Sequence, residues 1–335
     1  MMQIVNDFTH MDVAALDSFV EKHPNGNFFQ SGKALEFFRS VPKHQPVVIV
    51  ALDNNEVIGS LLSVIIRDWS SIKGYFTRRC ITWGGPLVKE GKEEAILPII
   101  REFDKVMATR AIYSELRNMF EMSAFSDALS SCGWNYEEHL NIVIDLTKSE
   151  KDLWNDVHSK RKNGIRKGEK EGTRVELVTN KVELGQTYEI LRQVYRRAKL
   201  PLPEFEFFET AYDLLSPDYF KPFAALNDGK IIGTTYAITF GDTIYDWYAG
   251  GRSDYYDKRP NDVMPWQVFL WGKKEGYRMF DFGGAGKPDV AYGVRDYKKK
   301  FGGQVVNYGR FEKIHKPLLY RTVKAGFNVY QRIIP

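Results

Sequence analysis

Two stretches of the sequence decide the fold: Ala51-Leu52-Asp53-Asn54-Asn55-Glu56-Val57-Ile58-Gly59-Ser60 and Ala225-Leu226-Asn227-Asp228-Gly229-Lys230-Ile231-Ile232-Gly233-Thr234. Each stretch predicts a β-hairpin, because Asn54-Asn55 and Asp228-Gly229 favour a tight turn with positive φ and the flanking residues are apolar. Since the two stretches align residue by residue, the sequence indicates an internal repeat.

The predicted elements that follow each hairpin come in the same order. The first copy continues with a strand at 81–88, a helix at 93–108 and a strand at 112–116; the second continues with a strand at 244–249, a helix at 262–276 and a strand at 279–282. We therefore expect an α/β (α+β) protein of two similar domains, residues 1–145 and 174–335, each a mixed sheet flanked by helices. Residues 146–173 are expected to form a basic helical segment between them.

The composition fits a two-domain protein of the cytoplasm. A chain of 335 residues, of which 43% are hydrophobic, is long enough to form two cores. Its 47 basic and 43 acidic residues give a net charge of +4, which is too small to identify a nucleic-acid-binding protein. Cys80 and Cys132 form no CxxC pair, the first residues have no signal-peptide pattern, and no apolar run reaches membrane-spanning length. We expect a protein of the reducing cytoplasm.

The basic segment predicts two helices separated by a short break. Basic residues at four-residue spacing share one face of the second helix: Lys162, Arg166 and Lys170. Glycines share another face: Gly164, Gly168 and Gly172. Since each interior glycine costs a helix about 1 kcal/mol relative to alanine, this face indicates a close approach of another part of the chain. Two interpretations stay open for the basic residues, a solvated helix and a site for RNA phosphates formed by Lys160, Arg161 and Arg166.

Common catalytic and metal-binding motifs are absent from the sequence. Gly286-Lys287 is not part of a P-loop, because Asp281 and Pro288 stand where that motif needs a glycine and a Ser or Thr. The six histidines form neither an HExxH motif nor a close cluster, and no GxSxG motif occurs. We predict no metal site and no cofactor.

Four motifs in the second half follow the order and spacing of the FemABX peptidyltransferases. They are Lys160-Arg161-Lys162-Asn163-Gly164-Ile165-Arg166-Lys167-Gly168-Glu169-Lys170-Glu171-Gly172, Trp247-Tyr248-Ala249-Gly250, Phe280-Asp281-Phe282-Gly283-Gly284, and Tyr297-Lys298 with Phe301-Gly302. The resemblance is continuous over residues 150–310 and weaker before them, where Gln30 resembles the glutamine that opens the substrate-side helix of the first domain. It implies two tandem domains of the GNAT acyltransferase fold. It also implies transfer of an amino acid from aminoacyl-tRNA to the side-chain amine of a peptidoglycan precursor.

The chain departs from this family in three places. It has no heptad segment as long as the coiled-coil arm of members that lengthen glycine bridges, so it resembles the compact, armless members. Residues 31–39, after Gln30, contain no tryptophan, although compact members place one in the helix that faces the nucleotide-linked precursor. Neither residues 250–260 nor residues 83–86 contain the Arg/Gln-x-x-Gly-x-Gly loop with which CoA-using GNAT domains hold pyrophosphate. This last departure argues against acyl-CoA as the donor.

The candidate site residues cluster in the second copy of the repeat. Aminolysis of an activated acyl group needs a neutral amine, a place for the developing oxyanion and the removal of a proton. The resemblance implies that Lys298 stabilises the oxyanion or the ester phosphate side, and Asp281 is a candidate to accept a proton or orient the amine. The predicted substrate-binding residues are Tyr248, Trp247, Tyr297, Arg295 and Gln30. The alternatives are a solvated charge for Lys298, a turn residue for Asp281 and core aromatics on the strand.

We expect an aminoacyltransferase that uses aminoacyl-tRNA and an amine of a peptidoglycan precursor or related cell-envelope acceptor. Two alternatives stay open: an acyl-CoA-dependent N-acyltransferase acting on a sugar, lipid or small-molecule amine, and a non-catalytic binding protein of the same fold. Residues 313–335 have the mixed apolar and basic spacing of an amphipathic helix. This helix is expected to pack on the second domain, and contact with an anionic membrane surface is a second interpretation.

Overall fold

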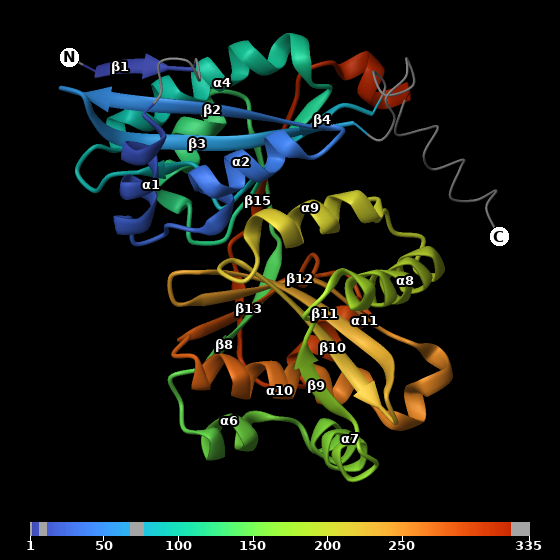
Figure 1. Ribbon diagram of the computed structural model, residues 1–335. Coiled ribbons are helices and arrows are strands. Elements are labelled where there is room, and N and C mark those ends of the chain that lie inside the picture. Colours follow the sequence, from blue (N-terminus) through green and yellow to red (C-terminus); the bar gives the residue numbers. More distant parts are fainter. Residues whose placement is uncertain (1, 7–11, 68–76, 323–335) are drawn as a thin grey trace. The chain divides into compact units, whose positions relative to one another are not determined.

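The structure, a computed structural model, describes residues 2–6, 12–67 and 77–322 (Figure 1). The chain divides into two compact units: unit 1 comprises Met1–Glu138 and Tyr308–Pro335, and unit 2 comprises His139–Asn307. Each unit is a mixed β-sheet flanked by helices, which confirms the predicted fold class.

The sheet of unit 1 has the strand order β1-β2-β3-β4-β6-β15-β7, and β5 pairs with β3. Its strands are β1 (Met2–Val5), β2 (His44–Asp53), β3 (Glu56–Ile66), β4 (Arg79–Trp83), β5 (Leu87–Val88), β6 (Tyr113–Arg117), β7 (Asn135–Glu137) and β15 (Arg310–Ile314). Its helices are α1 (Val13–Lys22), α2 (Gly32–Ser40), α4 (Ile96–Arg110) and α5 (Ser126–Ser131), with 3₁₀ helices η2 (Phe28–Gln30), η3 (Glu93–Ala95) and η4 (Ser123–Phe125). Helices α1 and α2 lie on one face of strands β2 and β3, and α4 lies on the other (Figure 1).

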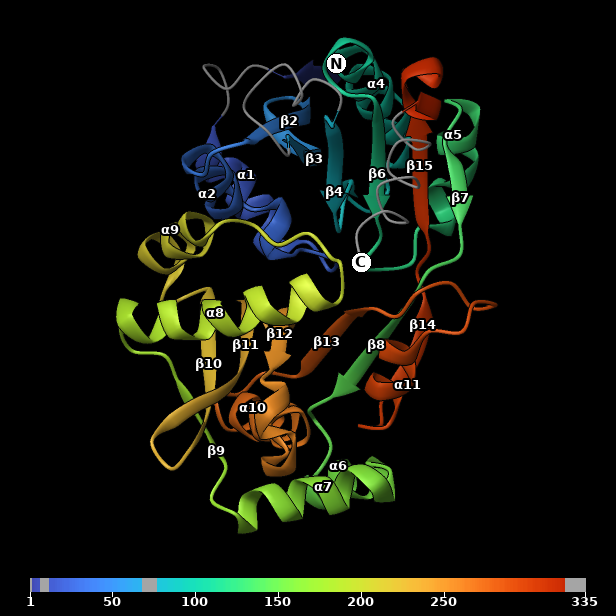
Figure 2. The ribbon, with the colours of Figure 1, turned by 90° about the vertical axis from the view of Figure 1, so that its right-hand side faces the viewer.

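The sheet of unit 2 has the order β9-β10-β11-β12-β13-β8-β14. Its strands are β8 (Leu140–Asp145), β9 (Arg174–Leu177), β10 (Phe220–Asn227), β11 (Lys230–Phe240), β12 (Thr243–Gly251), β13 (Met279–Gly284) and β14 (Gln304–Asn307). Its helices are α6 (Glu150–Asp156), α7 (Ser159–Lys170), α8 (Lys181–Arg197), α9 (Phe205–Leu215), α10 (Pro260–Lys274) and α11 (Gly293–Lys299), with the 3₁₀ helix η5 (Ser253–Lys258). Helix α8 lies on one face of this sheet and α10 on the other (Figure 2).

The two sheets repeat the same strand order, so the internal repeat predicted from the sequence is confirmed. Both predicted hairpins form, β2–β3 and β10–β11, and their turn residues have positive φ: Asn54 49°, Asn55 65°, Asp228 48° and Gly229 71°. Each hairpin also has a bulge at the same place in the repeat, after Ala51 and after Ala225. The likeness of the two copies therefore extends to irregularities of the backbone.

Each unit receives one strand from beyond its own copy of the repeat, and this corrects the predicted domain boundaries. Strand β8 follows β7 in the chain but lies between β13 and β14 of unit 2, whereas β15 follows β14 but lies between β6 and β7 of unit 1. Residues 146–173 are not an interdomain segment, since α6 and α7 belong to unit 2. A strand joins a sheet through partners remote in sequence, so local patterns could not locate these two strands.

Local sequence explains where the basic helices begin. Ser149 caps α6 by accepting a hydrogen bond from the backbone N–H of Asp152, and His158 caps α7 through the N–H of Lys160. Helix α10 begins at Pro260, whose fixed φ suits the first helical position. The predicted order of helix, short break and helix over residues 153–172 is confirmed.

A separate hydrophobic core forms in each unit. In unit 1, Ile99, Phe103 and Met107 of α4 pack against the sheet, and in unit 2, Phe269 of α10 packs against Phe280 of β13. All five residues are at most 1% exposed. Burial of such side chains stabilises a fold by roughly 1.5 to 3 kcal/mol each, so each unit has its own hydrophobic source of stability.

The carboxyl end differs from its predicted course. Lys313 belongs to strand β15 of unit 1, and a helix begins at residue 317, so the amphipathic helix does not start at Lys313 and its described part does not belong to unit 2. The remainder of the predicted helix, residues 323–335, lies outside the described residues. Within the described ranges, no helix is both long and apolar enough to span a bilayer.

Candidate active site

The parallel strands β12 and β13 of unit 2 separate partway along their length. They pair at Thr243↔Met279, Ile244↔Phe280 and Tyr245↔Asp281, and beyond these pairs Asp246 and Phe282 line a cavity between the two strands and α10. A register shift in β13 between Asp281 and Gly284 accompanies the separation. Bulges commonly adjust strands beside active sites. The cavity thus lies toward the carboxyl ends of two parallel strands, where α/β folds commonly bind ligands.

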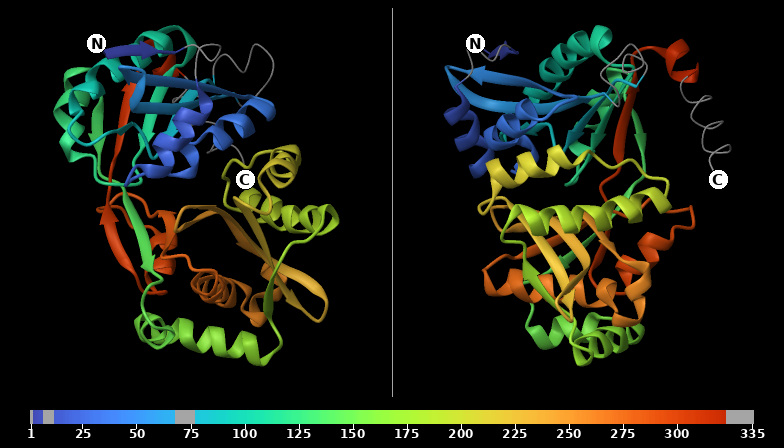
Figure 3. Two further views of the ribbon diagram at one scale, coloured as in Figure 1. Left: turned by 60° about the vertical axis from the view of Figure 1, so that its left-hand side comes forward. Right: turned by 45° about the vertical axis from the view of Figure 1, so that its right-hand side comes forward.

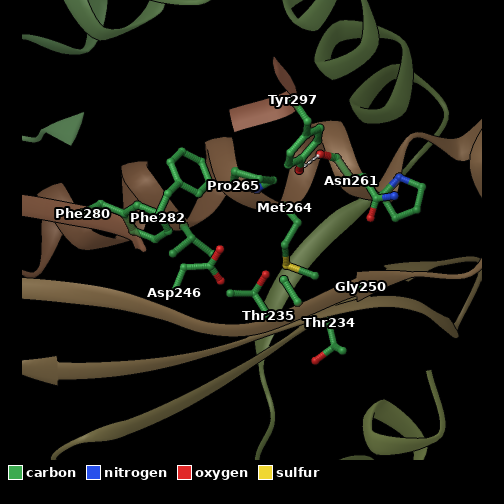
Figure 4. Close-up of a pocket in the computed structure, with 13 residues that line it drawn as sticks. Thr234, Thr235, Asp246, Gly250, Asn261, Met264, Pro265, Phe280, Phe282 and Tyr297 are labelled. Carbon is green, nitrogen blue, oxygen red and sulfur yellow. Dashed lines mark hydrogen bonds between the residues drawn. The ribbon is translucent and has the colours of Figure 1, made fainter. Parts of the chain in front are cut away.

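The cavity is small and mostly apolar (Figure 4). Its volume is about 40 Å³, and its lining residues are Thr234, Thr235, Asp246, Ala249, Gly250, Pro260, Asn261, Met264, Pro265, Val268, Phe280, Phe282 and Tyr297. A volume of this size holds a water molecule or a group only slightly larger. Asp246 supplies the carboxylate that lines this otherwise largely neutral space (Figure 4).

Asp246 is the site residue that sequence reasoning missed. Its Oδ1 atom is buried and has no hydrogen-bond partner in the described part of the chain. Burial raises the pKa of Asp246 to about 6, with a further upward effect from Asp281 and a downward effect from Lys298. Asp246 could have been identified from its place between two aromatic residues of a predicted strand. An acidic residue buried at such a position commonly has a function.

Lys298 and Asp281, the predicted catalytic pair, lie together beside Asp246. The ammonium of Lys298 on α11 donates hydrogen bonds to the carbonyl oxygens of Phe282, at 2.6 Å, and Gly284, at 2.9 Å. Burial lowers the pKa of Lys298, whereas Asp246 and Asp281 raise it. Lys298 is therefore not a solvated member of a lysine run, unlike its exposed neighbour Lys299.

Asp281 has a different environment from Asp246, although burial raises the pKa of both. Asp281 is 3% exposed, and its Oδ1 accepts a hydrogen bond of 2.7 Å from the backbone N–H of Gly283. Burial is the largest effect and raises the pKa of Asp281. Three smaller effects lower it: this hydrogen bond, the charge of Lys298 and the side chain of Asn141. The turn interpretation of Asp281 therefore agrees with its contacts, since its carboxylate holds the start of the turn at Gly283.

Tyr297 lines the cavity, as predicted, and is held by two neighbours. Its hydroxyl donates a 2.6 Å hydrogen bond to the carbonyl of Asn261, visible in Figure 4. The guanidinium carbon of Arg161 lies 4.6 Å from the centre of the Tyr297 ring. Burial raises the pKa of Tyr297, so its phenol stays protonated at neutral pH.

Trp247 and Tyr248, two of the predicted substrate-binding residues, pack against neighbouring helices, which agrees with their alternative interpretation as core aromatics. Their rings contact α9, where Phe208 lies 6.1 Å from Trp247 and 4.9 Å from Tyr248 between ring centres. The tyrosine ring also lies 5.7 Å from that of Tyr195 on α8. A register shift between Tyr236↔Tyr248 and Ala237↔Asp246 leaves Trp247 as an extra residue in the strand, which alters the alternation that the sequence implied.

Two further predicted substrate-binding residues, Gln30 and Arg295, form hydrogen bonds to the backbone of their own units. Gln30 in unit 1 is fully buried: its Nε2 donates to the carbonyls of Leu62 and Trp83, and its Oε1 accepts from the N–H of Leu62. Arg295 donates to the carbonyls of Lys287 and Val290, and so ties down the loop before α11. Both side chains hold backbone in place, which leaves them little capacity to bind a substrate.

The glycine face of α7 packs on the first turn of α10, which identifies the close approach predicted from the sequence (Figure 3, green beside orange). A Cβ added at Gly164 would collide with the carboxylate of Asp262, and one added at Gly168 would lie 2.5 Å from Cγ2 of Val263. Asp262 is 6% exposed and forms an ion pair with Arg161. The amino-terminal end of α10 is therefore covered by a helix and carries a buried acid.

The three predicted phosphate-binding residues differ in exposure. Lys160 and Arg166 are exposed on α7, and the guanidinium of Arg166 lies 5.2 Å from the Trp154 ring. Arg161 points inward instead, to Asp262 and the rings of Tyr297 and Phe301. The charge of Arg161 is compensated by Asp262 inside unit 2, so of the three residues Lys160 and Arg166 are the ones exposed to a phosphate.

The fold is that of two tandem GNAT-like domains, and the chain is similar to proteins named as transferases. A family model described as an acetyltransferase (GNAT) domain matches residues 156–299. The chain is 23% identical to the UDP-N-acetylmuramoylpentapeptide-lysine N(6)-alanyltransferase of Weissella viridescens, over 84% of this chain and 87% of the relative. It is 19% identical to the lipid II:glycine glycyltransferase of Staphylococcus haemolyticus, strain JCSC1435, over 92% of this chain and 93% of the relative.

A solved structure extends this likeness to the whole fold. The crystal structure of FemX superposes with a TM-score of 0.74 and 17% identity, covering 96% of this chain and 99% of FemX. The resemblance to the FemABX peptidyltransferases predicted from the motifs is confirmed by these relatives.

Proposed function

We propose that this chain transfers an amino acid from aminoacyl-tRNA to an amine of a peptidoglycan precursor, in the cleft where β12 and β13 separate. The observation that carries the proposal is the combination of this cleft with a fixed ammonium, Lys298, at its side. The two curated relatives, named as an alanyltransferase and a glycyltransferase, support both the type of group transferred and the type of acceptor.

The covered end of α10 supports aminoacyl-tRNA over acyl-CoA as the donor. A helix binds pyrophosphate through the free N–H groups and positive dipole of its first turn. In α10 this turn contains the buried Asp262, and α7 packs on it through Gly164 and Gly168. A pyrophosphate would displace α7 and meet a carboxylate, so the site is unsuitable for the part of CoA that GNAT domains hold most firmly.

The proposed reaction needs few groups. A neutral amine of the acceptor attacks the ester carbonyl carbon, the carbonyl oxygen becomes negative, and a C–N bond forms. The intermediate then loses the ribose oxygen, which takes a proton, while the attacking nitrogen gives up a proton. The ammonium of Lys298 is held by two carbonyls before substrate binds, so it can stabilise the oxyanion without reorganisation.

The exposed residues Lys160 and Arg166 are the proposed contacts for tRNA phosphates. Both stand on α7, in the unit that contains the cleft. Exposed cations bind phosphates by releasing counterions, and this binding weakens as salt rises. We also propose a cytoplasmic location, because aminoacyl-tRNA is made and used there.

A direct assay tests the proposal. The pure protein is incubated with UDP-linked muramyl pentapeptide and either radiolabelled aminoacyl-tRNA or radiolabelled acetyl-CoA. We expect label in the pentapeptide from aminoacyl-tRNA, and a large loss of transfer in Lys298→Met but not in Lys299→Met. Transfer from acetyl-CoA with none from any aminoacyl-tRNA would overturn the proposal.

A further inference from the structure

The carboxylate of Asp246 is an unusual group for the interior of unit 2. Its Oδ1 is buried without a hydrogen-bond partner among the residues that the structure describes, and it borders a cavity. Burying a charged oxygen without a partner is costly, so native proteins keep such groups where a ligand or a reaction needs them. The missing partner of Asp246 is therefore a clue to what the cavity receives.

The charges around Asp246 leave a place for one cation. The groups that act on it electrostatically are Lys298 of α11, Asp281 of β13, Tyr195 of α8 and Tyr297 of α11. When both acids are ionised, two carboxylates face one ammonium. That ammonium also donates to the carbonyls of Phe282 and Gly284. In that state the cluster has one more negative charge than positive charges, and Oδ1 of Asp246 has no hydrogen-bond partner among the described residues.

The size and lining of the cavity restrict the cation. About 40 Å³ accommodates a group close to the size of an ammonium or a methyl group. Met264, Pro265 and Phe282 give the cavity apolar walls, and Asp246 gives it one acceptor (Figure 4). A primary ammonium on a short carbon chain matches these features, because its N–H groups can reach the carboxylate while its carbon atoms contact the walls.

We propose that Asp246 binds a primary ammonium group of a substrate in the cavity between β12, β13 and α10. The inference rests on the proposed function, in which two substrates carry such a group: the α-ammonium of the aminoacyl donor and the amine of the acceptor. An α-ammonium is two bonds from the ester carbonyl carbon. Lys298 at the oxyanion and Asp246 at the ammonium would then hold the two sides of one aminoacyl group. An acyl group without an amine offers no partner for Asp246.

The test compares Asp246→Asn with the parent on two donors, alanyl-tRNA and the same tRNA carrying lactate, in which a hydroxyl replaces the ammonium. If Asp246 binds the donor, the parent prefers alanyl-tRNA in kcat/KM by about 10-fold to 100-fold, and the variant loses this preference. If it binds the acceptor amine, the variant loses the same factor with both donors, and the fall of the parent's kcat/KM below about pH 6 disappears. Parental rates, preference and pH profile in the variant would overturn the inference.

A matched control and a binding assay separate this inference from the proposed function. Asp242→Asn changes an exposed acid just before β12 and should leave all these quantities unchanged. In thermal melts, alanine methyl ester should raise the Tm of the parent more than methyl lactate does, and this difference should vanish in Asp246→Asn. If this difference in Tm is observed but no amino acid is transferred, the ammonium site is supported and the proposed reaction is rejected. If Asp246→Asn transfers at the parental rate and the two esters raise the Tm equally, the proposed reaction is kept and the ammonium site is rejected.

Discussion

Unit 1 and unit 2 have the same order of strands but differ where a site would form. In unit 1 the parallel strands β4 and β6 stay paired over five positions, from Arg79↔Tyr113 to Trp83↔Arg117, whereas β12 and β13 pair over three. At the position that matches Asp246, unit 1 has the neutral residue Thr82, whose hydroxyl lies 2.5 Å from that of Ser63, and at the position that matches Asp281 it has Glu115, which is paired with Arg117. In unit 2 the strands open around two carboxylates and an ammonium. The site proposed in unit 2 therefore depends on the opening of the parallel ladder and on these buried charges.

The largest expected effect comes from removing the ammonium of Lys298 in unit 2. Lys298→Met should slow transfer by about 10²-fold to 10³-fold, or roughly 3 to 4 kcal/mol, because a preorganised charge at the oxyanion is lost. It should also lower the free energy of unfolding by about 1 to 2 kcal/mol, since the carbonyls of Phe282 and Gly284 lose their donor. Single-turnover rates and thermal melts measure the two effects. Lys299→Met, at an exposed position, is the control, and equal rates in the two variants would refute the role of Lys298.

The next effect concerns stability rather than rate. The pKa of Asp246 is about 6 in the folded state, above the value of 3.8 for a free aspartate. As pH rises from 4 to 6 the unfolded chain releases this proton first, so the folded state loses stability, and the loss is complete above pH 6. Asp246→Asn should therefore stabilise the protein above pH 6 by roughly 2 to 3 kcal/mol and bring no gain at pH 4. Denaturant unfolding of the parent and the variant at pH 4 and at pH 7 measures this difference. An equal gain in the free energy of unfolding at both pH values would contradict the prediction.

Unit 1 should respond to acid in the opposite direction, through His315. Burial, Lys313 and Lys316 lower the pKa of His315 to about 4, and its Nε2 lies 2.8 Å from the hydroxyl of Ser114. As pH falls from 6.5 to 4, the unfolded chain takes up a proton that the folded state does not, and stability falls. Since His315 is partly accessible, we expect the loss to be roughly 2 kcal/mol and His315→Gln to remove it. Unfolding curves between pH 4 and 7 measure this, and an unchanged slope in the variant would refute it.

A smaller effect tests the helix packing that closes the first turn of α10. Gly164→Ala should destabilise the protein by about 1 to 3 kcal/mol, because the added Cβ collides with Asp262. Gly185→Ala is the matched control: it lies inside helix α8, with nothing within 4 Å of an added Cβ, and should stabilise by about 1 kcal/mol. Thermal melts of the two variants should shift in opposite directions. If both variants shift the Tm in the same direction, Gly164 of α7 is not in close contact with Asp262 of α10.

The smallest effect concerns tRNA binding. Changing Lys160 and Arg166 together to serine should reduce the slope of log affinity against log salt by about 1.4 to 1.8, because two phosphate contacts are lost. Lys230 and Lys274, which are also exposed in unit 2, give a control pair with the same change in net charge. Filter binding at several salt concentrations measures the slope. Equal slopes for the two double variants would mean that Lys160 and Arg166 do not contact tRNA phosphates.

The sequence predicted the parts of the fold that depend on neighbouring residues. Hairpin turns such as Asn54-Asn55, the strand–helix–strand order and the glycine contacts of α7 could all be inferred, because turn chemistry and helix periodicity are local. The exchanged strands β8 and β15 could not, since their hydrogen-bond partners are remote in sequence. The bulge at Trp247 had a similar effect on the site: it changes which residues of β12 share a face, so Asp246 was overlooked.

Some predicted site residues are held by contacts inside their own unit, and this has a common physical origin. Gln30 and Arg161 carry polar groups of the kind that bind substrates, but each is satisfied inside its own unit, by backbone amides for Gln30 and by Asp262 for Arg161. A sequence gives the type of a polar group and not whether it already has a partner. Tyr297, predicted to bind substrate, lines the cavity, and Lys298, whose role the resemblance implies, donates to the carbonyls of Phe282 and Gly284 at the end of β13. Their roles stay predictions.

The exchanged strands make the order of synthesis matter. Strand β15 lies between β6 and the edge strand β7, yet residues 310–314 are translated after nearly all of unit 1 and the whole of unit 2. On the ribosome, unit 1 must therefore wait with two open strand edges, which attract other chains. Unit 2 can assemble first, because β8 is made before the rest of its sheet. The amino-terminal half of this chain is thus the last to be completed, and it is the half for which a nascent chain most needs protection from aggregation.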